Sequence, residues 1–401
     1  MARLLEHHAL EFLAKGGIEV PGFAVAESAD ETEKAARSFG GRAVIKALIP
    51  AGGRGKAGAI KLAETPEEAG GYAADLLGQT VLNFPVERVL VSERVEIERE
   101  IFASIAFDSM TRRPMVLFSA LGGIEIEAIL DQDPDKLVQF PVEIGLGLQP
   151  FQAKEIAERA GLTGDVLLGA ARALIALYRV FCQLDAETVE VNPLAVTPES
   201  RIVAPTGVIV VDDQALHRHP ELDGIADPNL TNGWRPLTAL EKRMREIDAI
   251  DSGSAIRFNE LGDGRIAFMF TGGGAGFLAF DTMLRLGGDP ATTFDITPGF
   301  VEEKMYLATK AILALPGLKG LLAGGNITNF IPIDIKVRGV MRALKELKID
   351  PETFPVVFRF AGPGVEEAKE LAAEIPGIEY HDASSTIEDV VRSIIERTRE
   401  A

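Results

Sequence analysis

Short apolar runs alternate with amphipathic segments through the second half of the chain, and this rhythm restricts the possible folds more than any other feature. Runs of strand length and apolar character lie at 265–270, 293–296, 320–323, 355–360 and 378–381. Segments with helical spacing follow them at 277–286, 301–314, 333–347, 365–375 and 387–399. Strands that alternate with helices predict a parallel sheet covered on both faces, a flavodoxin-like doubly wound domain over residues 256–401. Ligands of such sheets bind at the carboxyl ends of the strands, so the candidate binding turns are 271–276, 324–332 and 361–364.

The first half has no such rhythm, and it predicts an α+β architecture over residues 1–220. Strand-like runs lie at 43–48, 88–92, 100–107, 114–119, 188–192 and 208–212. Helical spacing is present at the N-terminus and at 31–39, 66–77 and 152–182, the last with a break near Gly161. Residues 221–255 crowd Pro, Asn and Gly together, which predicts a linker that contains a short charged helix at 237–247.

The N-terminal segment carries charges within its apolar pattern, which indicates an amphipathic helix and not a signal peptide. The predicted buried stripe of this helix is Leu4, Leu5, His8, Ala9, Phe12 and Leu13. No run reaches membrane-spanning length, and a net charge of −19 disfavours a nucleic-acid or anionic-membrane surface. The single cysteine, Cys182, excludes an internal disulfide framework, and its apolar surroundings predict a buried, inert thiol. We therefore expect a cytoplasmic protein.

A glycine-rich stretch follows the predicted strand that ends near Lys46. In Pro50-Ala-Gly-Gly-Arg-Gly-Lys-Ala-Gly58 the backbone can expose several N–H groups to one anion, and Lys46, Arg54 and Lys56 add positive charge. The spacing is not that of a P-loop. The stretch predicts a phosphate-binding turn, with a flexible hairpin of solvated cations as the alternative.

A second constellation is Thr188-Val-Glu-Val-Asn-Pro-Leu194. Glu190 and Asn192 are two residues apart on a strand, so both side chains project to the same face. A carboxylate and an amide oxygen side by side suit Mg²⁺ held against phosphates. The alternative is an Asn-Pro turn beside a solvated glutamate.

Together these motifs resemble the β subunit of succinyl-CoA synthetase and its relatives malate–CoA ligase, citryl-CoA synthetase and ATP-citrate lyase. The resemblance rests on Lys46, Ala51–Gly58, Gly122-Gly-Ile-Glu-Ile-Glu127 and Glu190–Leu194, and it spans nearly the whole chain. It implies an ATP-grasp domain followed by a CoA-ligase flavodoxin-like domain. It also implies ATP, Mg²⁺ and coenzyme A as cofactors, with the coenzyme bound mainly by a partner subunit.

Residue by residue, the resemblance assigns the phosphates to Lys46, Gly53, Arg54 and Gly55. It assigns a nucleotide contact to Glu100, and Mg²⁺ to Asn192. A further contact glutamate of the family falls at Ser92, with Glu93 adjacent. Glu190 is implied to face the phosphorylated histidine of a partner α subunit, and we also consider it as a metal ligand.

One departure concerns the metal site. The family's second metal ligand is an aspartate, and its counterpart in this chain is Thr206. A threonine hydroxyl is a poorer Mg²⁺ ligand than a carboxylate. Either Glu190 or water completes the site, or metal binding is weak, and loss of ATP chemistry stays an open alternative.

The predicted acid-binding turn also differs from that of the succinate-using relatives. Residues 326–330 resemble the Ser-Ile-Ala-Asn-Phe loop of ATP-citrate lyase, and Thr271 stands where succinate-using relatives have asparagine. Ile331 and Phe360 depart from the lyase pattern, which has threonine and a second arginine there. Citrate is therefore preferred over succinate as the acid. The candidate substrate residues are Thr271, Gly272, Asn326, Thr328, Asn329, Phe330 and Arg359.

The expected activity is an ADP-forming carboxylate–CoA ligase in which a phosphoryl group passes through a histidine of the α subunit in a hetero-oligomer. The chain has five histidines, and none of them lies in the family's phosphorylation motif. They are His7, His8, His217, His219 and His381. The alternatives are a ligase subunit for succinate or another dicarboxylate, a non-catalytic nucleotide-sensing subunit, and an ATP-grasp ligase that does not use coenzyme A.

Overall fold

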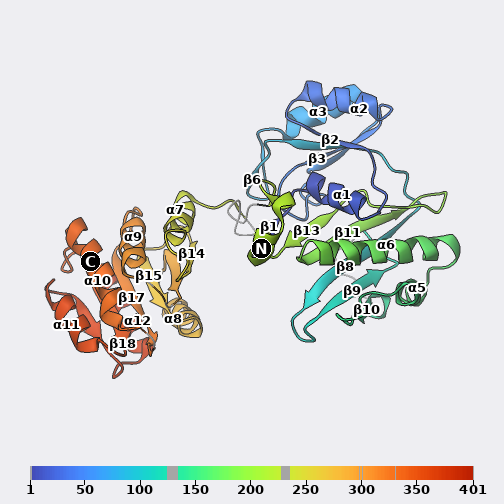
Figure 1. Ribbon diagram of the computed structural model, residues 1–401. Helices are drawn as coiled ribbons and strands as arrows, with labels where there is room; N and C mark the ends of the chain where they lie inside the picture. The colour runs from blue at the N-terminus through green and yellow to red at the C-terminus, as the bar shows by residue number, and fades with distance from the viewer. Residues whose placement is uncertain are drawn as a thin grey trace. The chain divides into compact units, whose positions relative to one another are not determined.

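The computed structural model describes residues 2–123, 134–226, 235–297, 299, 301–329 and 331–400. The chain divides into two compact units, Met1–Pro236 and Leu237–Ala401, here called the first and the second unit (Figure 1). This division falls inside the predicted linker. The predicted combination of an α+β first part and a doubly wound α/β second part is confirmed.

The larger sheet of the first unit is antiparallel, with strand order β1-β13-β11-β8-β9-β10 and β12 beside β11. Val189 and Val191 of β11 are fully buried and belong to the same core as Leu174 of helix α6. The predicted break near Gly161 is confirmed, because Gly161 has a φ of +83° between helices α5 and α6. The strands are β1 (Ala2–Arg3), β8 (Arg99–Asp108), β9 (Arg113–Ser119), β10 (Val138–Pro141), β11 (Ala186–Val196), β12 (Ile202–Val203) and β13 (Val208–Val211). The helices are α1 (Glu6–Lys15), α5 (Pro150–Arg159) and α6 (Gly164–Gln183).

A smaller antiparallel sheet of the first unit has the order β2-β7-β3-β4, and helices α2 and α3 cover it (Figure 1). Each of these helices begins where its sequence supplies a side-chain cap. The Oγ of Ser28 accepts from the N–H of Glu31, and the Oγ1 of Thr65 accepts from the N–H of Glu68. The elements are β2 (Phe23–Ala26), β3 (Ala43–Ala47), β4 (Ile60–Ala63), β7 (Val89–Glu93), α2 (Ala29–Ser38) and α3 (Pro66–Leu76), with the hairpin β5 (Thr80–Val81) and β6 (Phe84–Pro85).

The N-terminal prediction needs correction. Ala2–Arg3 form strand β1, which pairs with β13, and helix α1 begins only at Glu6. Of the predicted stripe, Leu4, Ala9 and Leu13 are buried, whereas Leu5, His8 and Phe12 are only half-buried. The buried side chains of α1 also include Glu6, His7 and Leu10, which the prediction left out.

The prediction for Cys182 is wrong, because the thiol-bearing residue is exposed. Leu174, Leu177 and Phe181 share the inward stripe of helix α6 and are buried. Cys182 follows Phe181 by one position, about 100° around the helix, and therefore lies off that stripe.

The second unit contains a parallel sheet of order β15-β17-β18-β19. Phe268 and Phe270 of β15 belong to a core with helices α8 and α12, whereas Ala267 and Met269 belong to a core with α9, α10 and α11. A strand buried on both faces explains its unbroken apolar sequence. The strands are β15 (Ile266–Thr271), β17 (Gly320–Ile327), β18 (Val356–Ala361) and β19 (Glu379–His381). The helices are α7 (Ala239–Asp248), α8 (Gly274–Arg285), α9 (Glu302–Leu313), α10 (Ile333–Leu347), α11 (Val365–Ala373) and α12 (Ile387–Glu400).

One predicted strand does not join this parallel ladder. Strand β16 (Thr292–Ile296) pairs antiparallel with β14 (Ile256–Glu260), a strand that the sequence reading missed although Ile256 and Phe258 alternate with polar residues. The Thr292 hydroxyl lies 3.1 Å from both the N and the O of Phe268. The hydroxyl thus bonds the backbone N–H and carbonyl groups of Phe268 at the edge of β15, and the backbone of β16 pairs with β14.

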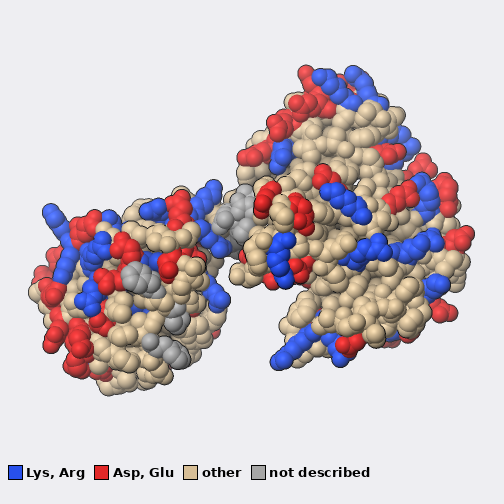
Figure 2. Space-filling view, in the orientation of Figure 1, with Lys and Arg blue, Asp and Glu red and all other residues tan. Residues whose placement is uncertain are grey.

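Charged side chains of both signs are interspersed over both units on the face shown in Figure 2. Among the described residues, no helix is both long enough and apolar enough to span a bilayer.

Candidate functional site

A cleft of about 680 Å³ lies in the first unit between the smaller sheet and strand β11. Val44, Ile60 and Leu62 give it an apolar wall, and Lys46 stands at the end of that wall on strand β3. Of the described residues that line it, none is a histidine. The other polar or proline residues at its edge include Ser92, Glu93, Glu100, Asn192, Pro193, Pro205 and Thr206. One apolar wall opposite polar oxygen and nitrogen atoms suits a ligand with an aromatic base and a charged end.

Two cations of the phosphate-binding prediction converge on one buried carboxylate. The Nζ of Lys46 donates to Oε1 of Glu6 at 2.7 Å and to the carbonyl oxygen of Pro205 at 2.7 Å. The guanidinium of Arg54 forms an ion pair with Oε2 of Glu6, and its Nη1 donates to the carbonyl oxygen of Ala47 at 3.1 Å. Glu6 is 4% exposed and Lys46 is 5% exposed, so the contacts hold Lys46 in one position out of bulk water.

Glu6 stays ionised because of these contacts. Burial by itself raises the pKa of a carboxyl group. At Glu6 the attraction of Lys46 and Arg54, and the hydrogen bonds from both, outweigh burial and lower the pKa from 4.5 to about 2. The carboxylate is therefore a permanent counter-ion at neutral pH, and it keeps two like-charged side chains together.

The glycine-rich stretch folds into a compact turn that brings Arg54 to Glu6. The N–H of Ala57 donates to the carbonyl oxygen of Gly53, and the N–H of Ala59 donates to that of Arg54. Gly53 has a φ of +75°, a conformation that favours glycine. Gly53 and Gly55 are exposed, and residues 53–55 do not line the cleft in this conformation. Their proposed contact with phosphates stays a prediction.

Strand β11 places Glu190 and Asn192 as the sequence predicts. Both side chains are half-buried and alternate with the buried Val189 and Val191. Asn192 lines the cleft, and its Oδ1 accepts from the N–H of Gly123 at 2.8 Å. Burial and the repulsion of Arg54 lower the pKa of Arg3 on strand β1. The Glu190 carboxylate lies near enough to Arg3 to raise this pKa, but by less.

Gly122 and Gly123 allow a close approach of the chain to strand β8. A Cβ on Gly122 would lie 2.5 Å from the carbonyl oxygen of Ile101, and one on Gly123 would lie 1.8 Å from Oε2 of Glu100. This approach explains the glycine pair of the quoted motif. The rest of that motif, residues 124–127, lies outside the described residues.

The two glutamates assigned to the nucleotide both reach the cleft. Glu100, on β8, is exposed at its edge. Glu93 also lines the cleft, beside Ser92, and its Oε2 accepts from the N–H of Gly22 at 3.3 Å. Thr206 lies on the same lining as Asn192, so the threonine occupies the position where the family aspartate is expected to complete the metal site.

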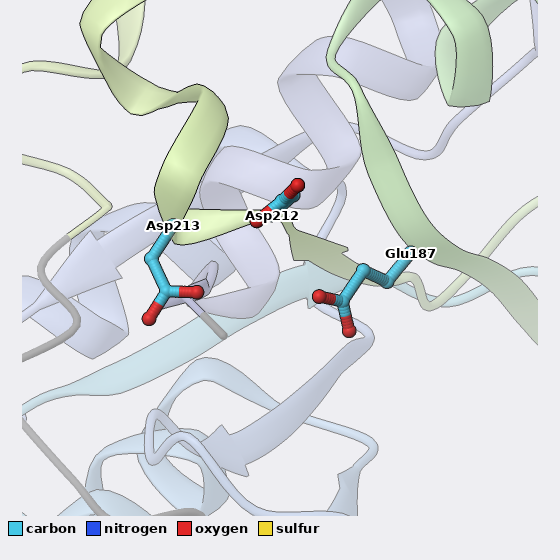
Figure 3. A group of neighbouring side chains, drawn as sticks. All are labelled: Glu187, Asp212 and Asp213. Carbon is cyan, nitrogen blue, oxygen red and sulfur yellow. The ribbon is translucent and has the colours of Figure 1, made fainter. Parts of the chain in front are cut away.

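An acidic group lies elsewhere in the first unit and was not predicted. Glu187, Asp212 and Asp213 each offer a carboxylate oxygen, and these oxygens lie within 4.8 Å of one another (Figure 3). Burial raises the pKa of Glu187, and the two aspartates add to the effect. The group is half-buried and distinct from Glu190 and Asn192.

In the second unit, four predicted substrate residues meet at the carboxyl ends of adjacent strands. Thr271 ends β15 and is paired with Gly325 of β17, whose carbonyl oxygen accepts from Nη1 of Arg359 at 2.5 Å. The side chain of Asn326 lies against Gly272, where a Cβ would come within 2.8 Å of it. Thr328 is half-buried and its N–H donates to the carbonyl oxygen of Ala361 at 2.9 Å, whereas Asn329 is exposed and Phe330 lies outside the described residues.

Comparison with known proteins places this architecture in a family. Residues 3–196 match the ATP-grasp domain family, and residues 235–396 match the citrate-binding domain family of ATP citrate lyase. The chain is 37% identical to the β subunit of a GDP-forming succinate–CoA ligase of Thermus thermophilus over 98% of both chains. It is also 37% identical to the ADP-forming counterpart of Chloroflexus aurantiacus over 93% of both. The chain belongs to the succinate–CoA ligase β-subunit family.

A solved structure supports the same fold for this member of the succinate–CoA ligase β-subunit family. ATP citrate lyase from Methanothrix soehngenii, in complex with citrate and coenzyme A, superimposes with a TM-score of 0.79 at 22% identity. The match covers 98% of this chain and 99% of the lyase chain. At this identity the likeness concerns the fold and not the acid that is bound.

Three site residues of this β-subunit chain were missed from the sequence. Glu6 lies within an amphipathic pattern, in which a glutamate is expected to be exposed. Arg3 lies in a strand of two residues, which is too short to show a pattern. Lys336 lies on α10 and is 6% exposed, with its Nζ donating to the Oγ1 of Thr271 at 3.2 Å. A charged residue on the inward stripe of a helix is the one signal that marks both Glu6 and Lys336 in the sequence.

Proposed function

We propose that the chain is the β subunit of an ADP-forming carboxylate–CoA ligase, and that ATP binds in the cleft of the first unit. The observation that carries this proposal is that two hydrogen bonds, to Glu6 and to the Pro205 carbonyl, fix the position of Lys46. Lys46 lines the same cleft as Asn192. A buried ammonium that is already oriented can meet a phosphate oxygen without a further entropy cost for ordering its side chain. Val44, Ile60 and Leu62 supply an apolar surface for the base.

Mg²⁺ fits the oxygen atoms at the cleft. Glu190, on the same face of β11, supplies a carboxylate, and Asn192, which lines the cleft, supplies an amide oxygen that also accepts from the N–H of Gly123. Thr206 adds only a neutral hydroxyl, which is consistent with a metal that keeps several waters and shares phosphate oxygens. When bound, Mg²⁺ would neutralise charge on the phosphates, while Lys46 holds them in place.

The phosphoryl group is proposed to leave the cleft through a histidine of a partner α subunit. None of the described residues at the cleft is a histidine, and His219 and His381 are held by carboxylates elsewhere: Nε2 of His219 lies 2.7 Å from Asp185, and Nε2 of His381 lies 2.5 Å from Glu379. Glu190 is proposed to orient the partner's histidine. Coenzyme A is assigned mainly to that partner.

The second unit is proposed to bind the acid at the ends of β15, β17 and β18. The match of residues 235–396 to the citrate-binding family, and the arrangement of Thr271, Asn326 and Arg359, favour citrate. Succinate or another dicarboxylate is the alternative, since the two relatives compared above are succinate–CoA ligase subunits.

The test uses the chain purified together with its α-type partner. Citrate, succinate and malate are screened for ADP formation that depends on coenzyme A. We expect citrate to be the best acid, and Lys46→Met to lower ADP formation with every acid by at least about 100-fold. Lys34→Met, an exposed change on helix α2, serves as the matched control and should leave activity unchanged.

Thr206 motivates a second candidate, a nucleotide-sensing subunit. A well-formed complex that binds ATP but forms no ADP with any acid would support that candidate and contradict the ligase proposal. In a ligase with a weak metal site, Thr206→Asp should lower the Mg²⁺ concentration needed for half-maximal activity.

A further inference from the structure

Two cations are buried at the carboxyl ends of the parallel strands in the second unit. Lys336 reaches this point from helix α10 and is 6% exposed, and Arg359 reaches it from strand β18 and is 7% exposed. Lysine and arginine are seldom buried to this extent unless an anion or a set of acceptors compensates the charge.

Both cations are directed at one place in the sheet. The Nζ of Lys336 donates to Oγ1 of Thr271 at 3.2 Å, and Nη1 of Arg359 donates to the carbonyl oxygen of Gly325 at 2.5 Å. Thr271 and Gly325 are register partners on adjacent strands. A Cβ on Gly325 would lie 2.6 Å from the Thr271 hydroxyl, so only glycine lets the two backbones meet so closely there.

The recorded partners of these cations are neutral. No ion pair within 4 Å joins either of them to a carboxylate in the described part of the second unit. Asp295 attracts Lys336 electrostatically, although burial lowers the pKa of Lys336 by more than this attraction raises it. The Asp295 carboxylate is itself engaged by the N–H groups of Gly272 at 2.8 Å and Gly273 at 3.3 Å.

Unused donors remain at this point. An ammonium has three N–H groups, and one hydrogen bond of Lys336 is recorded within the described residues. The Nε of Arg359 is buried and has no acceptor among the described residues. A buried donor without an acceptor is unfavourable, and more so if it is charged, so the arrangement suits an acceptor that comes from outside the chain.

We propose that Lys336 determines acid specificity: with Arg359 it forms a two-cation receptor for the non-reacting carboxylates of a tricarboxylic acid. This proposal rests on the proposed function for the identity of the reaction. One carboxylate of the acid must stay free to be activated, so two cations match two further carboxylates. A dicarboxylate can use only one of them.

The first measurement is direct binding to the complex of this chain with its partner subunit, by calorimetric titration with citrate and with succinate. We expect Lys336→Met to weaken citrate binding by about 10- to 100-fold, and succinate binding by much less. Lys345→Met is the matched control on the same helix, because Lys345 is exposed and its ion-pair partner within the described residues is the exposed Glu374. Equal citrate affinity in the wild type and Lys336→Met would overturn the proposal, and so would a wild type that binds neither acid.

The second measurement separates a binding role from a structural one. Methionine fills a similar volume without a buried charge, so the melting temperature of Lys336→Met should be unchanged or raised. A marked fall in melting temperature together with unchanged citrate affinity would identify Lys336 as structural.

The third measurement separates this inference from the proposed function. If the ligase proposal holds, the ratio of kcat/KM for citrate to that for succinate falls in Lys336→Met by about 10-fold or more, while KM for ATP is unchanged. If the wild-type complex forms no ADP with any acid but Lys336→Met loses citrate binding, the ligase proposal fails and the receptor stands.

Discussion

At its candidate site each unit holds two cations largely out of bulk water, but the two pairs are compensated in different ways. In the first unit Lys46 and Arg54 share the Glu6 carboxylate, which is buried with them. In the second unit the described contacts of Lys336 and Arg359 are to a hydroxyl and a carbonyl oxygen. The first pair is neutralised in part by the fold, whereas we propose that the second pair depends on the ligand.

The difference has a chemical reason under the proposed function. A nucleotide brings its own divalent cation, so a fixed carboxylate beside Lys46 and Arg54 does not repel an unshielded triphosphate. A polycarboxylic acid brings no cation, and a fixed carboxylate in its site would compete for the same donors. An internal counter-ion therefore suits the first unit, and uncompensated donors suit the second.

The largest expected effect is from Glu6→Gln. This change leaves Lys46 and Arg54 buried without a counter-ion, which should cost about 3–5 kcal/mol in the free energy of unfolding. Calorimetric melting measures the loss. Glu19→Gln is the control, because the Glu19–Arg201 pair is exposed and should contribute no more than about 1 kcal/mol. Equal losses in both variants would show that Glu6 contributes no more than an exposed ion pair, and the first unit would then have no internal counter-ion of special weight.

The acid dependence of stability tests the same carboxylate in the wild type. The unfolded Glu6 binds a proton below its usual pKa of 4.5, and the folded one only below about 2, so between these values the unfolded state holds more protons. The stabilisation from Glu6 is therefore complete above about pH 4.5 and is lost as the pH falls toward 2. It should amount to something on the order of 3 kcal/mol. Denaturant unfolding at about pH 6 and about pH 3.5 should show a smaller loss for Glu6→Gln than for the wild type.

A pair of double-mutant cycles sharpens the comparison further. Glu6→Gln combined with Lys46→Met should give a coupling energy of about 2 kcal/mol, because each single change strands the other charge. Asp295→Asn combined with Lys336→Met should couple by no more than about 0.5 kcal/mol. A strong coupling in the second unit would show that Asp295 is the counter-ion of Lys336 and would weaken the receptor proposal.

The smallest expected effect concerns the exposed Cys182. A thiol-specific reagent should label the native chain at Cys182 without a change in melting temperature, since the residue lies off the buried stripe of helix α6. If the reagent labels Cys182 only after the chain is unfolded, the thiol is buried, as the sequence predicts.

Much of the architecture is readable from local patterns, and the exceptions are instructive. The alternation in the second half predicts nearly every helix and strand there, because period and length report burial on one or both faces. The prediction for strand β16 is wrong because the Thr292 hydroxyl occupies the backbone groups of Phe268 on β15. A repeating pattern of apolar residues does not indicate such a contact. Helix α1 is predicted correctly in type, but its buried face includes Glu6, which the predicted stripe leaves out.

By itself the sequence determined the order of the two folds, the glycine-rich turn after Lys46 and the Glu190–Asn192 strand, because each depends on residues close together in the chain. Only the tertiary structure decided which charges meet. Glu6 reaches Lys46 across 40 positions, and Lys336 reaches Thr271 across 65. Such pairings follow from how helices dock on sheets. A local pattern indicates that a side chain points inward, but not which residue it contacts there.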